Sequence, residues 1–166
     1  GHPAPEILFI GEGPGADDLL TKLGPVVREA RTWGHARTPS LLVEALHVLK
    51  RTKELGIEHV HVHFATDSAV VAMLMKKLGG PSYSITAHAK DIYQAELNPG
   101  RLLETKMGAA RFVATCTCAN AQVLAARHPR PCDLHTIYHG LDTDVFAPGG
   151  SARPTLPVLL SVGRFV

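Results

Sequence analysis

Apolar residues along the chain switch between the spacing of a helix and the spacing of a strand. A helical face begins after Thr38-Pro39, where a cap is followed by a first-turn proline, and it ends at Gly56. A short alternating run follows, and this pair of patterns then recurs. The pattern predicts helices at 38–56, 66–80, 101–107 and 117–129, and strands at 59–64, 83–87, 112–116, 134–138 and 158–162. Strands that alternate with helices predict an α/β fold, a Rossmann-like parallel sheet with helices on both faces.

The two ends of the chain depart from this repeat. Residues 19–31 predict a helix that is broken at Gly24-Pro25. Near the other end, a stretch rich in proline, glycine and serine separates the strand 158–162 from everything before it. We therefore expect an N-terminal domain over residues 1–150, incomplete at its own N-terminus. Residues 151–166 are expected to be a linker and the first strand of a truncated second domain.

Composition indicates a globular protein and excludes several classes of partner. Of the 166 residues, 45% are hydrophobic and 19% are charged, and 17 basic against 15 acidic residues give a net charge of +2. The basic residues are scattered, which argues against nucleic acid as a partner. Three cysteines make a poor disulfide framework, and no apolar run reaches the roughly 18 residues of a membrane span. We expect a cytoplasmic protein.

Histidine is unusually frequent, with ten in the chain, and its positions are informative. In an open parallel sheet, ligands bind beyond the carboxyl ends of the strands. Residues capable of chemistry stand at four of these predicted ends: His63, His88, Cys116-Thr117 and His139-Gly140. Because three of the four carry a histidine, the sequence predicts a binding or catalytic site at this edge of the sheet.

Five short motifs accompany these strand ends. They are residues 61–65, 83–93, 112–117 with Asn120, 137–146 and 160–164. In this order and at these spacings they resemble the motifs of the group 1 glycosyltransferases, which are retaining enzymes with the GT-B fold. The resemblance runs from about residue 39 to residue 166. The chain departs from it at His139, where the family commonly has asparagine.

The resemblance implies two Rossmann-like domains that face each other across a cleft, with the donor held mainly by the C-terminal domain and the acceptor by the N-terminal one. It implies a catalytic role for His88 beside the reacting sugar and the donor phosphates, and a contact between Arg164 and the donor diphosphate. The further motif positions that line the N-domain side of the cleft are His63, Thr117, Asn120 and Gly140.

The function that the resemblance implies is hexosyl transfer with retention, as in polysaccharide biosynthesis. The expected partners are a nucleotide-sugar donor and a glycan or lipid-linked acceptor, with no nucleic acid and no transmembrane segment, while peripheral membrane contact is compatible with such an acceptor. We expect no metal and no cofactor besides the donor as co-substrate. We also expect this chain alone to be inactive, because the family's C-domain lysine and acidic pair would lie beyond Val166.

Two other functions fit parts of the sequence. A non-catalytic glycan-binding module would share the fold and the motifs. A metal-dependent hydrolase could use His59, His61 and His63, which alternate along one strand and therefore share a face. Hydrogen bonds to neighbouring side chains would explain the same three histidines without a metal.

Two smaller clusters also have an alternative interpretation. The cysteines Cys116, Cys118 and Cys132 could bind a soft metal or undergo oxidation, although cysteine is also a common small buried residue. The glycine-rich residues 11–15 could hold a phosphate, but a cluster without a following Lys-Ser/Thr pair or a third spaced glycine is typical of a turn.

Overall fold

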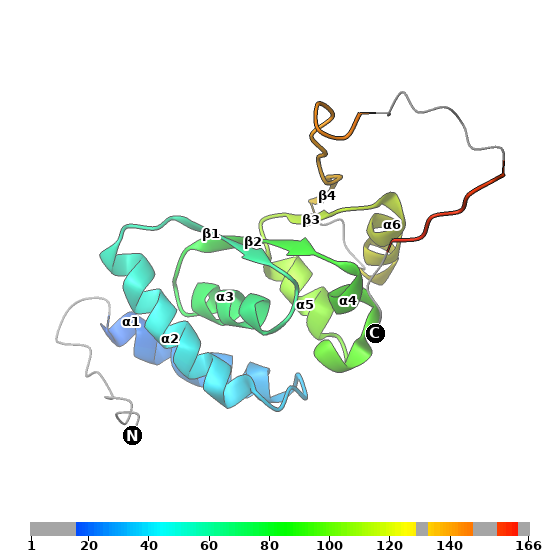
Figure 1. Ribbon diagram of the computed structural model, residues 1–166. Coiled ribbons are helices and arrows are strands. Elements are labelled where there is room, and N and C mark those ends of the chain that lie inside the picture. The colour runs from blue at the N-terminus through cyan, green and yellow to red at the C-terminus, as the bar shows by residue number, and fades with distance from the viewer. Residues whose placement is uncertain (1–15, 129–132, 148–155, 163–166) are drawn as a thin grey trace, which may run out of the picture.

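Four parallel strands form a sheet in the order β1-β2-β3-β4 (Figure 1). The computed structural model describes residues 16–128, 133–147 and 156–162. The strands are β1 (His59–His63), β2 (Ser82–Ala87), β3 (Val113–Thr115) and β4 (Leu134–Thr136). The register pairs Val62 with Ile85 and Ile85 with Val113, so that apolar side chains of neighbouring strands share a face. The predicted α/β class and the parallel sheet are confirmed.

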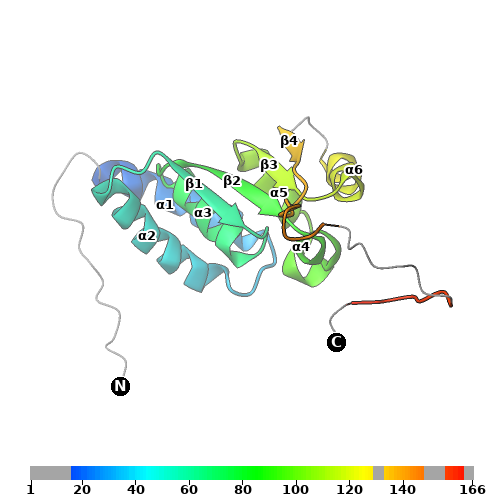
Figure 2. The same cartoon turned by 45° about the horizontal axis from the view of Figure 1, so that its top comes forward.

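Helices cover the apolar face of this sheet. They are α1 (Ala16–Arg31), α2 (Thr38–Glu54), α3 (Asp67–Lys77), α4 (Ala89–Tyr93), the 3-10 turn η1 (Ala95–Leu97), α5 (Leu102–Ala109) and α6 (Cys118–Arg127). Because parallel crossovers are right-handed, a sheet whose strands follow chain order carries its crossover helices on one face. Helix α3 contacts β1 and β2, while α2 and α1 pack on α3 as an outer layer (Figure 2).

The core lies between the sheet and helix α3. Alternate strand residues point toward the helices, and Val62, Ile85 and Val113 are buried there. The residues of α3 that are buried lie on most sides of the helix: Ala69, Val70, Ala72, Met73, Leu74 and Met75. A helix that is apolar almost all round is expected where it is enclosed, here by the sheet on one side and α2 on the other.

The opposite face of the sheet is polar and open. Its residues are His59, His61 and His63 of β1, Ser82, Ser84 and Thr86 of β2, Phe112 just before β3, and His135 of β4. The side chains of His61, His63 and His135 are exposed. The helix cover that the sequence predicted for this second face is not found among the described residues, because the crossovers all lie on the other side.

Two predicted helix ends are confirmed, and glycine explains both. Gly56 follows α2 with φ +64°, and Gly79 follows α3 with φ +91°. Left-handed backbone of this kind costs glycine little and lets the next N–H turn back to the helix. After α3, the N–H of Gly80 donates to the carbonyl oxygen of Met75 at 3.0 Å.

The predicted break in the first helix is wrong. Helix α1 continues through Pro25 to Arg31. Proline removes one backbone hydrogen bond and crowds the preceding turn, but packing can hold the two halves of a helix in line. Leu19 on one side of Pro25, and Val26 on the other, are both buried in the core.

The predicted strand 158–162 is also absent from the described residues. Residues 156–162 have no regular secondary structure, and the side chain of Leu159 is fully exposed. A parallel strand forms only beside another strand, and this segment has none next to it. The linker at 148–155 lies outside the described residues. No helix in the described part of the chain combines the length and apolarity needed to cross a membrane.

Candidate functional site

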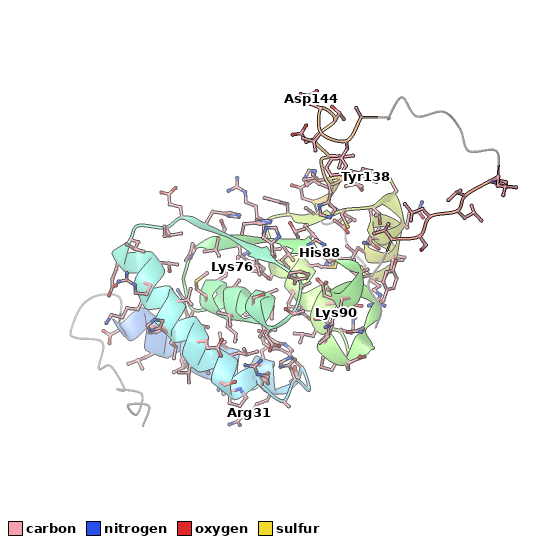
Figure 3. The ribbon with its side chains drawn as sticks, in the orientation of Figure 1. Arg31, Lys76, His88, Lys90, Tyr138 and Asp144 are labelled. Carbon is pink, nitrogen blue, oxygen red and sulfur yellow. The ribbon has the colours of Figure 1, made fainter. Side chains whose placement is uncertain are left out.

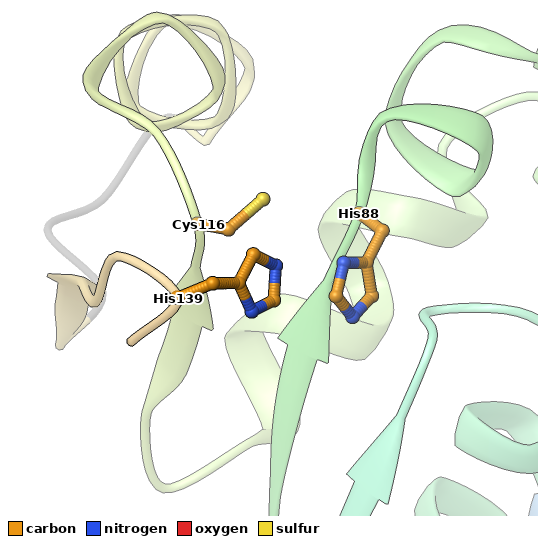
Figure 4. A group of neighbouring side chains, drawn as sticks. All are labelled: His88, Cys116 and His139. Carbon is orange, nitrogen blue, oxygen red and sulfur yellow. The ribbon is translucent and has the colours of Figure 1, made fainter. Parts of the chain in front are cut away.

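The carboxyl ends of the strands bring predicted site residues to one edge of the sheet. His63 ends β1, His88 follows β2 and Cys116 follows β3. His139 belongs to the segment after β4, and its side chain lies beside those of His88 and Cys116 (Figure 4). We call His63, His88 and His139 the histidine cluster, and the edge on which it lies the carboxyl edge.

His88, labelled in Figure 3, has ring contacts with both other members of the histidine cluster. Its ring centroid is 6.5 Å from that of His63 and 6.1 Å from that of His139, and both neighbouring rings are nearly parallel to it. The ring of Phe64 is tilted against it at 4.7 Å. The His88 side chain is half-buried, so that a ligand at the carboxyl edge can reach it while its neighbours limit its movement.

A buried carboxylate fixes the backbone of His88. His88 is the N-cap residue of α4, and its N–H donates to the two carboxylate oxygens of Asp91 at 3.1 and 3.2 Å. Asp91 is 1% exposed, and it also accepts a hydrogen bond from the N–H of Ala65. One side chain therefore joins the turn after β1 to the turn after β2, with bonds strengthened by its charge.

Lys106 supports the same turn from inside the domain. Its side chain is fully buried, and its Nζ donates to the carbonyl oxygens of Ala65 at 2.5 Å and Thr66 at 3.3 Å. Burial lowers the pKa of Lys106 to about 8, and the charges of Asp91 and Asp67 offset part of this effect. The turn after β1 is thus held on both sides: the Asp91 carboxylate accepts from its N–H, and the Lys106 Nζ donates to its carbonyl oxygens.

The turn that these groups hold is strained at Phe64. Its φ is +70°, and no other non-glycine residue in the described ranges has a positive φ. The left-handed conformation costs roughly 1–2 kcal/mol for a residue with a bulky side chain. The N–H of Phe64 donates to the carbonyl oxygen of Thr86 at 2.9 Å, and its ring is 47% exposed next to His88. Strain of this kind occurs at ligand sites, where the surrounding structure over-determines the backbone.

Thr117 and Asn120 lie just behind the carboxyl edge and make internal contacts. Thr117 caps α6, because its hydroxyl accepts from the N–H of Asn120 at 3.1 Å. The side-chain oxygen of Asn120 accepts from the hydroxyl of Tyr93 at 3.1 Å, which links α6 to α4. Asn120 is nearly buried, and its amide nitrogen lies 4.0 Å from the sulfur of Cys116. In this structure both residues therefore position the site more than they face it.

The two remaining predicted site residues are Gly140 and Arg164. Gly140 is exposed beside His139, and a Cβ at this position would meet no atom within 4 Å. Its φ is also outside the left-handed region, so neither conformation nor space requires glycine here. Arg164 lies outside the described residues, as do the glycine-rich residues 11–15 and Cys132.

Hydrogen bonds to neighbouring side chains account for two histidines of β1. The ring nitrogens of His59 lie 2.8 Å from the hydroxyls of Ser82 and Ser84. Those of His61 lie 2.7 Å from the hydroxyl of Ser84 and 2.9 Å from that of Thr86. Burial, then the charges of His63 and His59, lower the pKa of His61, which favours its neutral form. This geometry gives the strand-based hydrolase no free set of ligands.

Three residues that shape the site were not predicted from the sequence: Phe64, Asp91 and Lys106. Phe64 and Asp91 fall inside the quoted motifs, but nothing in the sequence showed the positive φ of the first or the burial of the second. Lys106 gave a usable signal, because it occupies a position on α5 between the buried residues Leu103 and Met107. A lysine on the apolar side of a helix is rarely buried unless it has partners.

Comparison with known protein families yields a match. The family model described as Glycosyltransferase Family 4 matches residues 6–145, which is most of the chain and includes all the described strands. A search of curated proteins finds no matching protein.

Proposed function

This chain belongs to glycosyltransferase family 4, and we propose that it forms the acceptor-side domain of a retaining transferase. The reaction moves a sugar from a nucleotide-sugar donor to a glycan or lipid-linked acceptor. One observation carries the proposal. The histidine cluster lies at the carboxyl edge of a parallel sheet, which is where this kind of fold binds ligands, in a chain whose family transfers sugars.

The donor side of the reaction is assigned to His88. As the sugar leaves, negative charge builds on the nucleotide diphosphate, and a fixed N–H donor directed at that charge lowers the barrier. The half-buried imidazole offers such a donor, and the bonds from its backbone to Asp91 keep it in position. Helix α6 begins at the same edge with no acidic residue in its first turn, so its dipole also favours an anion. By its motif, Arg164 is assigned a contact with the same diphosphate.

The acceptor side is assigned to Phe64 and His63. The exposed ring of Phe64 offers a flat apolar surface, and the exposed imidazole of His63 beside it offers hydrogen-bonding groups. A sugar presents the matching combination of an apolar ring face and hydroxyls. Sites for small molecules commonly combine aromatic surface with a few fixed polar groups in this way.

Sugar transfer by variants at His88 tests the proposal. The 166-residue chain, and the complete reading frame that encodes it, are assayed with a panel of nucleotide sugars and glycan or lipid-linked acceptors. We expect transfer where an acceptor-side domain and a donor-binding domain are both present. There His88→Ala should lower the turnover rate by about 10²–10³-fold, the usual effect of removing one such donor. His47→Ala is the matched control, because His47 is exposed on α2, outside the histidine cluster.

Three outcomes separate the alternatives. Normal turnover by His88→Ala would remove His88 from the chemistry. Binding of acceptor without turnover by any product would indicate the non-catalytic glycan-binding module. Robust turnover by the 166-residue chain itself would contradict its assignment as the acceptor-side domain alone.

A further inference from the structure

Three side chains that commonly bind metals meet at the carboxyl edge. One ring nitrogen each from His88 and His139 and the sulfur of Cys116 all lie within 4.8 Å of one another. The three come from separate segments, and their side chains point toward a shared space (Figure 4). A tetrahedral ion bound at roughly 2.0–2.3 Å by nitrogen and sulfur holds such atoms about 3.5 Å apart. Side-chain rotations that shorten the distances by about 1 Å would therefore close the set.

Cys116 and His139 are available for binding, and His88, whose side chain receives the N–H of Asp91 in the capping box of α4, has a second ring nitrogen. Cys116 is a free thiol and half-buried, and the amide nitrogen of Asn120 lies 4.0 Å from its sulfur. A donor placed next to a ligand atom in this way orients the ligand. The imidazole of His139 is exposed and, within the described residues, stacks on His88 without a hydrogen bond. In contrast, both ring nitrogens of His61 are already in contact with hydroxyls.

We propose that His88, Cys116 and His139 form a binding site for a divalent transition metal ion, with zinc as the expected ion. Magnesium and calcium prefer oxygen ligands, whereas two imidazoles and a thiolate suit zinc. Three protein ligands leave a fourth position for water, as in catalytic zinc sites. On binding, the S–H bond of Cys116 breaks, the proton passes to solvent, and the sulfur keeps the electron pair that it shares with the metal. Each imidazole binds through its unprotonated nitrogen.

This inference differs from the expectation of no metal and goes beyond the proposed function. The sequence led us to consider the histidines of 59–63 and the three cysteines as separate sites. The structure instead joins one cysteine to His88 and His139. An imidazole nitrogen that binds a metal cannot also contact the donor diphosphate, so one nitrogen of His88 cannot serve both roles at once.

Cobalt titration tests the site directly. The reduced 166-residue chain, free of any added histidine tag, is titrated with Co²⁺. We expect one equivalent to bind with a near-ultraviolet charge-transfer band from a cobalt–thiolate bond and with the intense visible bands of tetrahedral cobalt. Zinc should then remove both. The charge-transfer band separates this site from weak binding to the chain's other histidines, because it requires a cysteine sulfur.

Variants show which residues hold the ion. Cys116→Ser should abolish the charge-transfer band. His139→Ala should weaken cobalt binding at least about tenfold, since loss of a mere hydrogen-bond partner of a ligand already costs 10–100-fold. Cys118→Ser is the matched control, because Cys118 is an exposed free thiol only two residues away from Cys116. It should leave the spectrum and the affinity unchanged.

Several results would overturn the proposal. They are the absence of the band in the wild-type chain, its survival in Cys116→Ser, its loss in Cys118→Ser, and an unchanged affinity in His139→Ala. His139 is exposed, so its variant is expected to fold, and thermal melts of each variant check this. The spectra are recorded without donor or acceptor. A failed titration therefore leaves the proposed function standing, and a failed transfer assay leaves the metal site standing.

Discussion

Replacing Lys106 by methionine should remove a pH dependence from the stability of the domain. Lys106 is fully buried, and burial lowers its pKa from 10.5 to about 8. Between these values the unfolded chain binds more protons than the folded one, so the free energy of unfolding rises with pH. Each pKa unit corresponds to about 1.4 kcal/mol, so the rise is roughly 3 kcal/mol over the whole interval. About half of it, ~1.5 kcal/mol, falls between pH 8 and pH 9.5.

Denaturant unfolding followed by circular dichroism measures this effect. The free energy of unfolding is determined at several values from about pH 8 to pH 9.5 for the wild type, Lys106→Met and Lys90→Met. The wild type should gain about 1.5 kcal/mol relative to Lys106→Met across this range. Lys90 is exposed on α4, so Lys90→Met should follow the wild type (Figure 3). Other titrating groups, such as Tyr83, are common to all three proteins and cancel in the differences.

The absolute stability of Lys106→Met depends on two opposing effects. Methionine leaves the carbonyl oxygens of Ala65 and Thr66 without their donor, which costs about 1–3 kcal/mol for each buried group. It also removes a charge that is costly to bury, and this gain is largest below pH 8, where the lysine is protonated. The variant should therefore come closest to the wild type at the lower end of the range. Parallel pH curves for the two proteins would refute the reasoning, and a relative loss of wild-type stability with rising pH would reverse its sign.

Two further predictions concern the strained turn and the C-terminal segment. Phe64→Gly should be about 1 kcal/mol more stable than Phe64→Ala in denaturant unfolding. Both variants remove the ring, but only glycine tolerates the φ of +70° at low cost. Equal stabilities of the two variants would show that the turn is unstrained. Deleting residues 154–166 should shift the melting temperature by no more than about 3 °C and reduce self-association in analytical ultracentrifugation, because residues 156–162 are exposed. Unfolding on deletion would place that segment in the domain core.

Much of the fold followed from patterns that act over a few residues. The alternation of valine and histidine in β1 predicted both a strand and two chemically different faces, and the structure has Val62 buried and His61 exposed. Gly56 predicted a helix end because left-handed backbone is cheapest for glycine. The proximity of His63 and His88 also followed, because parallel strands end on the same edge and their carboxyl-terminal residues must be neighbours.

Other features depend on contacts between distant segments, which a local pattern does not contain. The helix through Pro25 persists because buried residues on both sides hold it. His139 reaches His88 because of the path of the chain after β4, which no periodicity describes. The positive φ of Phe64 is held by contacts with distant segments, since its own N–H donates to Thr86 and the next residue, Ala65, is bound by Asp91 and Lys106 from two sides.

The division between exposed and buried groups at the carboxyl edge makes function and stability separable by mutation. His88 meets its neighbours through ring contacts, through a backbone N–H that any residue would supply, and through the capping box of α4, in which its side chain receives the N–H of Asp91. Loss of its imidazole should therefore cost the fold no more than a helix cap, about 1 kcal/mol. Lys106 has the opposite character, since it is fully buried and bonds the turn that carries His63 and Phe64. A variant at His88 should therefore lose activity at an almost unchanged melting temperature. A variant at Lys106 should instead lose stability. Its activity should fall only as far as the turn is displaced.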